Sequence, residues 1–186
     1  MPILSSKRLV GLALALSLSA APALAKNPMV GGAPMFPDKP IAVNASHAKN
    51  LTTLVAAAKA AGLVDTLAGP GPFTVFAPTN TAFKALPKGT VETLLKPENV
   101  EKLKGILLGH VVPGDLGPAD LDNQIKDGGG KAVLKTANGD SLTVMKSGKG
   151  FSVTDGAGGT AKVEIADVKQ SNGVVYVINK VLLPAG

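Results

Sequence analysis

The feature that most limits how this chain can fold is a change in hydrophobic periodicity near residue 125. Before this point apolar residues recur at the spacing of an amphipathic helix, most clearly over 51–58. After it, short apolar runs alternate with glycine-rich breaks. Two Asn-Gly pairs, at 138–139 and 172–173, each separate two such runs, and this arrangement predicts β-hairpins.

The order of these patterns predicts an α+β fold. An antiparallel β-sandwich or wedge should form, with several α-helices packed at one side or end. Expected helices cover 51–61, 79–86, 90–95 and 97–108, and expected strands cover 73–77, 110–112, 132–136, 142–145, 151–154, 162–168 and 174–183. We expect one domain over 38–184, preceded by an extended, loosely ordered lead-in at 26–37 that is rich in Pro and Gly.

The first 25 residues have the pattern of a secretory signal peptide. Lys7 and Arg8 precede an apolar stretch at 9–18, and Ala23-Leu24-Ala25 supplies a small-x-small cleavage sequence. The stretch is about half the ~20 residues that a spanning helix needs. We expect cleavage after Ala25 and a secreted or periplasmic protein with no stable membrane insertion afterwards, and an uncleaved anchor is the alternative.

Composition argues against several classes of function. The chain has no Cys and two His, which removes thiolate chemistry and three-His zinc sites within one chain. Arg8 is the only Arg, and aromatic residues make up 3%, so phosphate clamps and base-stacking platforms are scarce. No Gly-x-Ser-x-Gly elbow is present. We therefore expect no metal or other cofactor, no nucleic-acid partner and no enzymatic activity.

Four segments resemble the fasciclin (FAS1) domain family, and the resemblance covers roughly 38–184. They are LTTLVAAAKAAGL at 51–63, GPFTVFAPTNTAF at 71–83, LLGHVVPG at 107–114 and SNGVVYVINKVLLP at 171–184. The resemblance implies a β-sheet wedge with several helices. It also implies a secreted or surface-attached module for adhesion and protein interaction, generally not an enzyme.

Several residues in these segments are expected to maintain the fold rather than perform chemistry. A buried His110 should bond to backbone or to a polar side chain of the 79–81 turn. The phenylalanines should pack in the core, and Thr and Asn should hold the strand-to-helix turn. The structural set is Thr74, Phe76, Pro78, Thr79, Asn80, Phe83, His110, Asn172 and Gly173.

Asp167 and Val168 are the candidate binding residues. In animal matrix members of the family an Asp-Ile pair just before the last segment is tied to integrin-dependent adhesion, and here the pair is Asp167 and Val168. The chain departs from the family at this pair and at Gly109, where Tyr is usual. An acid beside an apolar residue near a turn predicts a small contact site.

These observations favour an exported, non-enzymatic module that binds a protein, a matrix component or a cell-surface glycan. One alternative is a periplasmic small-ligand or polysaccharide-binding protein, which should have a concave apolar pocket near His110 and Asn80. Another is an envelope hydrolase that uses His110 with Asp115 or Asp120.

Overall fold

The computed structural model describes residues 27–184, and the predicted signal peptide at 1–25 lies outside this range. In chain order the elements are β1 (Met29–Val30), β2 (Ala33–Pro34), α1 (Ile41–His47), α2 (Thr52–Ala60), α3 (Val64–Ala68), β3 (Phe73–Pro78), α4 (Asn80–Lys84), α5 (Thr90–Leu94), a 3₁₀ turn (Pro97–Asn99), α6 (Val100–Leu108), β4 (Val111–Pro113), α7 (Pro118–Asp127), β5 (Lys131–Lys135), β6 (Ser141–Ser147), β7 (Gly150–Thr154), β8 (Thr160–Gln170) and β9 (Gly173–Ile178).

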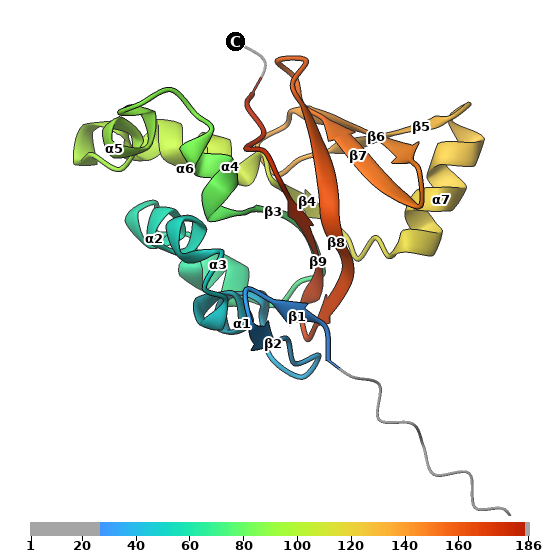
Figure 1. The fold of residues 1–186 in the computed structure, drawn as a ribbon, viewed down its shortest axis with the longest axis horizontal. Helices are drawn as coiled ribbons and strands as arrows, with labels where there is room; N and C mark the ends of the chain where they lie inside the picture. The colour runs from blue at the N-terminus through green and yellow to red at the C-terminus, as the bar shows by residue number, and fades with distance from the viewer. Residues whose placement is uncertain (1–26, 185–186) are drawn as a thin grey trace, which may run out of the picture.

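Seven strands form one sheet in the order β4-β3-β9-β8-β7-β6-β5. All neighbouring strands are antiparallel except β3 and β9, which run parallel in the centre. Helices α1–α6 lie on one side of the sheet, and α7 lies on the other (Figure 1). The α+β prediction is confirmed.

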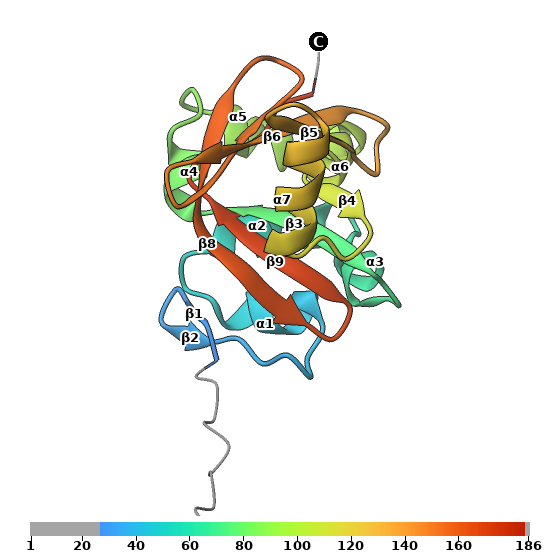
Figure 2. The ribbon, with the colours of Figure 1, turned by 90° about the vertical axis from the view of Figure 1, so that its right-hand side faces the viewer.

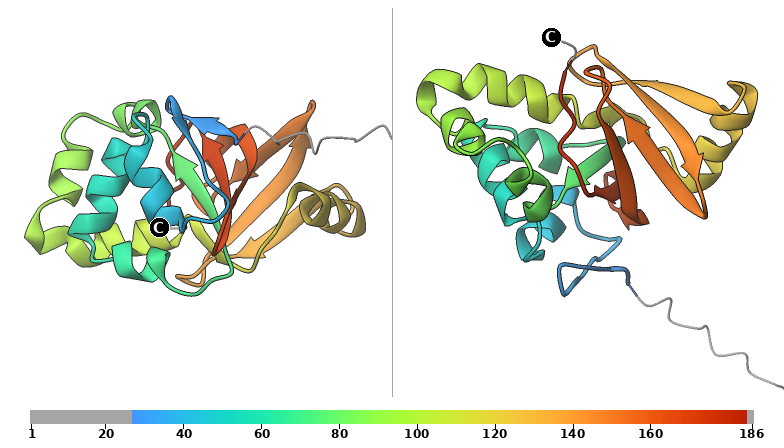
Figure 3. Two further views of the ribbon diagram at one scale, coloured as in Figure 1. Left: turned by 90° about the horizontal axis from the view of Figure 1, so that it is seen from below. Right: turned by 45° about the horizontal axis from the view of Figure 1, so that its top comes forward.

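The sheet bends so that β5–β7 diverge from the central strands, which produces the predicted wedge (Figure 3). Helix α7 packs against β5 and β6 and closes the open side of this wedge. Figure 2 looks directly at that side and shows α7 in front of the central strands.

Strand β9 is buried on both faces, because it separates two hydrophobic clusters. Successive side chains of a strand point to opposite faces. Val174, Tyr176 and Ile178 therefore join the cluster within the wedge, while Val175 and Val177 join the cluster under α1 and the N-terminal segment. A third cluster joins α2 to α4, α5 and α6.

Both Asn-Gly hairpins are present, as β5–β6 and β8–β9. The β8–β9 hairpin requires a glycine at position 173. Its φ is 147°, and a Cβ there would lie 1.8 Å from the carbonyl oxygen of Phe73. The neighbouring parallel strand comes so close at this point that no larger residue fits.

The lead-in at 26–37 differs from our expectation. It forms the short β1–β2 hairpin instead of a loosely ordered segment. Val30 and Met35 are 1% and 2% exposed and belong to the cluster under α1. Two-residue strands are too short to show a period in the sequence, so only the tertiary contacts reveal them. The start of the domain at residue 38 stays a prediction.

Further expectations about helices and strand ends need correction. The expected helices do not include α1, α3 or α7, and Asp120 lies in α7. The last strand ends at Ile178 and not near 183, because Asn179 turns the chain. Its side-chain oxygen accepts a hydrogen bond from the Lys162 amide at 2.9 Å, and its own amide donates to the Lys162 carbonyl at 3.1 Å.

Candidate functional site

Asn172 joins two helices to the sheet. Its Oδ1 accepts a hydrogen bond from the Ile41 amide at 3.0 Å, at the start of α1. Its Nδ2 donates to the carbonyls of Leu67 and Gly69 at 2.8 and 2.9 Å, at the end of α3. One buried amide therefore satisfies backbone groups at two helix ends, groups that have no partner within a helix.

Asn80 connects the strand-to-helix turn to α2. Its Oδ1 accepts from the Thr53 amide at 2.9 Å, so it caps α2 from a distant part of the chain. Its Nδ2 donates to the Lys49 carbonyl at 3.0 Å and to the Thr52 hydroxyl at 2.9 Å. The preceding Thr79 caps α4 itself, since its hydroxyl accepts from the Ala82 amide at 3.3 Å.

Thr74, Phe76 and Tyr176 hold the wedge side of the central strands. The Thr74 hydroxyl donates to the Gly114 carbonyl at 2.7 Å. The Tyr176 hydroxyl donates to the Leu116 carbonyl at 2.7 Å, and its ring stacks on Phe76 with centroids 5.5 Å apart. The remaining two residues of the structural set, Pro78 and Phe83, are buried.

His110 is 1% exposed and lies between α6 and β4. Its Nε2 accepts a hydrogen bond from the Leu182 amide at 2.9 Å, and its Nδ1 lies 2.9 Å from the Ile106 carbonyl. A carbonyl only accepts, so Nδ1 carries the proton. Burial lowers the pKa to about 4, opposed by the Ile106 bond and the charge of Asp155. The ring is therefore neutral at pH 7 with both nitrogens bonded to backbone.

The structure does not bring together the residues of the hydrolase alternative. Among the described residues, no hydrogen bond joins His110 to Asp115 or Asp120. Asp120 accepts from the Gly117 amide at 3.0 Å, at the start of α7. The acid that acts on His110 is Asp155, and its two oxygens accept from the amides of Gly159 and Leu183.

The candidate pair Asp167–Val168 is divided between two environments. It lies at a bulge in β8, where Ala166 and Asp167 face the single residue Tyr176 of β9. Asp167 has a φ of 56°, unusual for a residue other than Gly, and is partly exposed. Val168 is completely buried and faces the helical side of the sheet.

A cavity of about 350 Å³ lies between helices α1–α3 and the sheet, and we call it the helix–sheet cavity. His110 and Val168 contribute to its wall, but Asn80 does not. The sequence feature that indicates this cavity is the presence of alanines in α1 and α2, because their small side chains leave space above the strands. Representative lining residues are Val43 and Ala45 of α1, Leu54 and Ala58 of α2, Val75 of β3 and Val175 of β9.

Over residues 27–184 the structure contains no cluster of three His, Asp or Glu side chains arranged to hold a metal ion. Within the same range, every helix is too short or too polar to cross a membrane.

A family model for the fasciclin domain matches residues 49–184. The chain belongs to the fasciclin domain family. It is 49% identical to protein sll1483 of Synechocystis over 138 residues, 73% of this chain and 68% of that protein. It is 39% identical to immunogenic protein MPB70 of Mycobacterium bovis over 150 residues, 78% of this chain and 69% of that protein.

An animal relative is the transforming growth factor-beta-induced protein ig-h3 of Sus scrofa, 44% identical over 132 residues, which are 70% of this chain and 17% of that protein. Among solved structures, the FAS1 domain pair of the insect cell adhesion molecule Fasciclin I superimposes with a TM-score of 0.70 at 18% identity. The match covers 78% of this chain and 51% of the Fasciclin I chain, and it supports the assigned fold. Members of the fasciclin family are adhesion or interaction modules.

The geometry explains why the fasciclin segments contain these polar residues. Asn80 and Asn172 bind backbone groups of α1, α2 and α3, and Thr74 binds the loop after β4. His110 joins the end of α6 to the segment after β9. Together they attach the helices to the sheet.

Proposed function

We propose that this fasciclin domain is an exported, non-enzymatic interaction module. It binds a protein, a matrix component or a cell-surface glycan. The match of residues 49–184 to the fasciclin model carries the proposal, and relatives and fold neighbours that include a cell adhesion molecule support it. The polar groups of His110, Asn80 and Asn172 are occupied by the fold, which leaves recognition to the surface.

The proposed contact residue is Asp167. A bulge and a left-handed backbone re-aim its side chain, and such strained positions concentrate at functional sites. No donor among the described residues reaches its Oδ1. That oxygen is buried, so the partly exposed Asp167 meets a partner through the remainder of its carboxylate, whereas the buried Val168 supports the bulge from inside.

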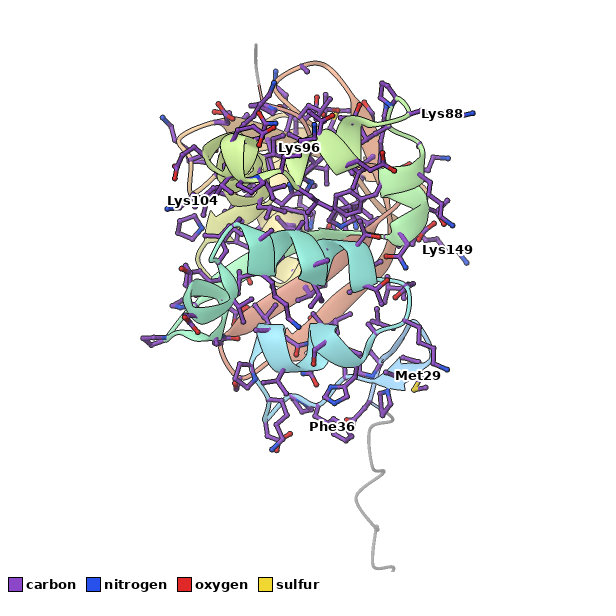
Figure 4. The ribbon with its side chains drawn as sticks, turned by 90° about the vertical axis from the view of Figure 1, so that its left-hand side faces the viewer. Met29, Phe36, Lys88, Lys96, Lys104 and Lys149 are labelled. Atoms are coloured by element: carbon purple, nitrogen blue, oxygen red, sulfur yellow. The ribbon has the colours of Figure 1, made fainter. Side chains whose placement is uncertain are left out.

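Surface lysines assist this role through a mildly positive field. Lys88, Lys96 and Lys104 lie on the helical side of the molecule, and Lys149, in the turn between β6 and β7, lies at the edge of the same view (Figure 4). Attraction between such charges and an acidic surface raises the association rate and weakens with salt.

The test is retention of the purified mature domain on cells, matrix proteins and isolated envelope. Wild type should be retained, and Asp167→Asn should weaken retention because it removes the charge while Asn tolerates the left-handed backbone. Asp127→Asn, at an exposed acid at the end of α7, is the matched control and should bind like wild type. If wild type is retained nowhere, the interaction role is wrong. Equal retention of all three proteins would exclude Asp167 as the contact.

We also propose that the chain is exported by cleavage after Ala25. Amino-terminal sequencing of the protein recovered from outside the cytoplasm should begin at Lys26. A chain that retains Met1 in the cytoplasm would contradict this.

The helix–sheet cavity favours the alternative of a small-ligand protein over a polysaccharide-binding one. Sugars need many hydrogen-bonding groups, and aromatic faces that can stack on them. Among the described residues that line the cavity, Phe73 is the only aromatic one apart from the neutral His110. The apolar wall suits an apolar ligand better than a sugar.

A further inference from the structure

The wall of the helix–sheet cavity is apolar because its interior polar groups are bonded within the protein. The Asn44 amide donates to the Phe36 carbonyl at 2.7 Å and to the Gln170 side chain. Its oxygen accepts from the Phe36 amide at 3.1 Å. The Gln170 amide donates to the Val168 carbonyl at 3.3 Å. His110 is also fully bonded, so these groups are not available to anchor a polar ligand.

The framework keeps the cavity open. Asn80 fixes α2, and Asn172 fixes α1 and α3, by hydrogen bonds to their backbone. The helices therefore keep their distance from the sheet although their alanines do not fill the space. Two of these alanines line the cavity, Ala45 from α1 and Ala58 from α2.

The cavity reaches the surface between α1, α2 and α3. Val43, Ser46, Lys59 and Thr66 line it and are also exposed, so they mark its mouth. Figure 4 looks at this side and shows α2 above α1 with strands behind them. Of the described lining residues, Lys59 alone carries a charge at pH 7, and none is acidic.

The volume of about 350 Å³ falls in the range of small-molecule sites, which begins near 300 Å³. One water molecule occupies roughly 30 Å³ in the liquid. If each heavy atom of a ligand takes about the same volume, the cavity accommodates about a dozen heavy atoms. Apolar cavities of even ~150 Å³ take up apolar molecules such as benzene.

We propose that the helix–sheet cavity binds a single-chain amphiphile, with an acyl chain of about a dozen carbons inside and an anionic head beside Lys59. The inference develops the small-ligand alternative and is independent of the interaction role of Asp167. The shared chemistry is one alkyl chain and one negative charge, supplied by a free fatty acid or a lysophospholipid.

The experiment is calorimetric titration of the lipid-stripped mature domain with octanoate, decanoate, dodecanoate and hexadecanoate, each below its micelle concentration. Burying a methylene should raise the affinity about fourfold. The affinity should therefore rise with chain length up to about twelve carbons and then level off as the cavity is filled. Dodecanoate and a lysophosphatidate with the same chain distinguish a carboxylate from a phosphate head.

Three variants locate the site. Ala58→Leu and Ala45→Leu add side-chain volume from different helices, and each should reduce dodecanoate affinity at least tenfold. Lys59→Gln should weaken dodecanoate two- to fivefold, as for an exposed ion pair, and leave dodecanol unchanged. Lys84→Gln, at an exposed lysine of α4 outside the cavity, is the matched control.

Binding that is unaffected by both alanine variants, or no binding of dodecanoate at millimolar concentration and of dodecanol up to its solubility limit, would overturn the proposal. An affinity that climbs without a break to sixteen carbons would also overturn it, because it indicates adsorption to the surface. Retention on matrix tests the interaction role separately, so either proposal can fail alone.

Discussion

Acidification should destabilise this domain through His110. The folded state holds the pKa of His110 at about 4, and its ordinary value is 6.5. Between pH 6.5 and about 4, His110 binds a proton in the unfolded chain but stays neutral in the folded chain. The stability contributed by the neutral ring is thus complete above pH 6.5 and is lost as the pH falls to about 4.

The magnitude follows from the gap between the two pKa values, about 2.5. At 1.36 kcal/mol for each pH unit, the free energy of unfolding should fall by about 3 kcal/mol across this window. That is a large part of the 5–15 kcal/mol typical of a domain. The cause is burial of the ring between backbone partners at Ile106 and Leu182.

Urea unfolding of the mature domain at several pH values between 7.5 and 4 measures this effect. Wild type and His47→Gln, which alters the exposed histidine, should show the same decline. His110→Gln should start less stable by about 1–3 kcal/mol, because it disturbs buried hydrogen bonds, and should decline less steeply. The carboxylates are common to all three proteins, so their contribution cancels in the comparison.

An NMR titration of the His110 ring checks the premise directly, including the case in which His110→Gln does not fold. The ring protons should stay at their neutral positions down to about pH 5. Titration near 6.5 in the folded protein, or equal slopes for wild type and a folded His110→Gln, would refute the reasoning.

Three further predictions concern the framework. Gly173→Ala should cost about 3 kcal/mol or more, because its Cβ meets the Phe73 carbonyl and its φ is positive. Gly129→Ala, also at positive φ but with open space around it, should cost only about 1–2 kcal/mol. Equal melting temperatures for the two variants would contradict the close approach of the strands. Asn172→Ala should cost about 2–4 kcal/mol in urea unfolding, since it removes three hydrogen bonds to two helices. A loss below about 0.5 kcal/mol would show that the helices do not depend on it. Tyr176 is the only tyrosine, and burial, with the nearby charge of Asp167 and other acids, raises its pKa above the ordinary 10.0. Phenolate absorbance in the near ultraviolet should therefore stay low at pH 10 in the folded domain, and half-ionisation there would count against the burial of its hydroxyl.

The candidate site was only partly predictable. The sequence indicates that His110 and Asn80 maintain the fold, but it does not identify all of their partners, since Leu182 lies 72 residues from His110. The sequence predicts that Asp167 and Val168 form one contact pair. The bulge in β8 places the two side chains in different environments, and no local sequence pattern predicts this bulge.

Local sequence was sufficient for the class of fold, for helices α2, α4, α5 and α6 and for both hairpins, because periodicity and Asn-Gly turns act over a few residues. Long-range placement set the rest. The parallel pairing of β3 with β9, the β1–β2 hairpin and the helix–sheet cavity depend on segments far apart in the chain. Asn172 illustrates the reason, since it lies 131 residues from the helix start that it caps. Neither its partners nor the space between helices and sheet exists until those segments meet.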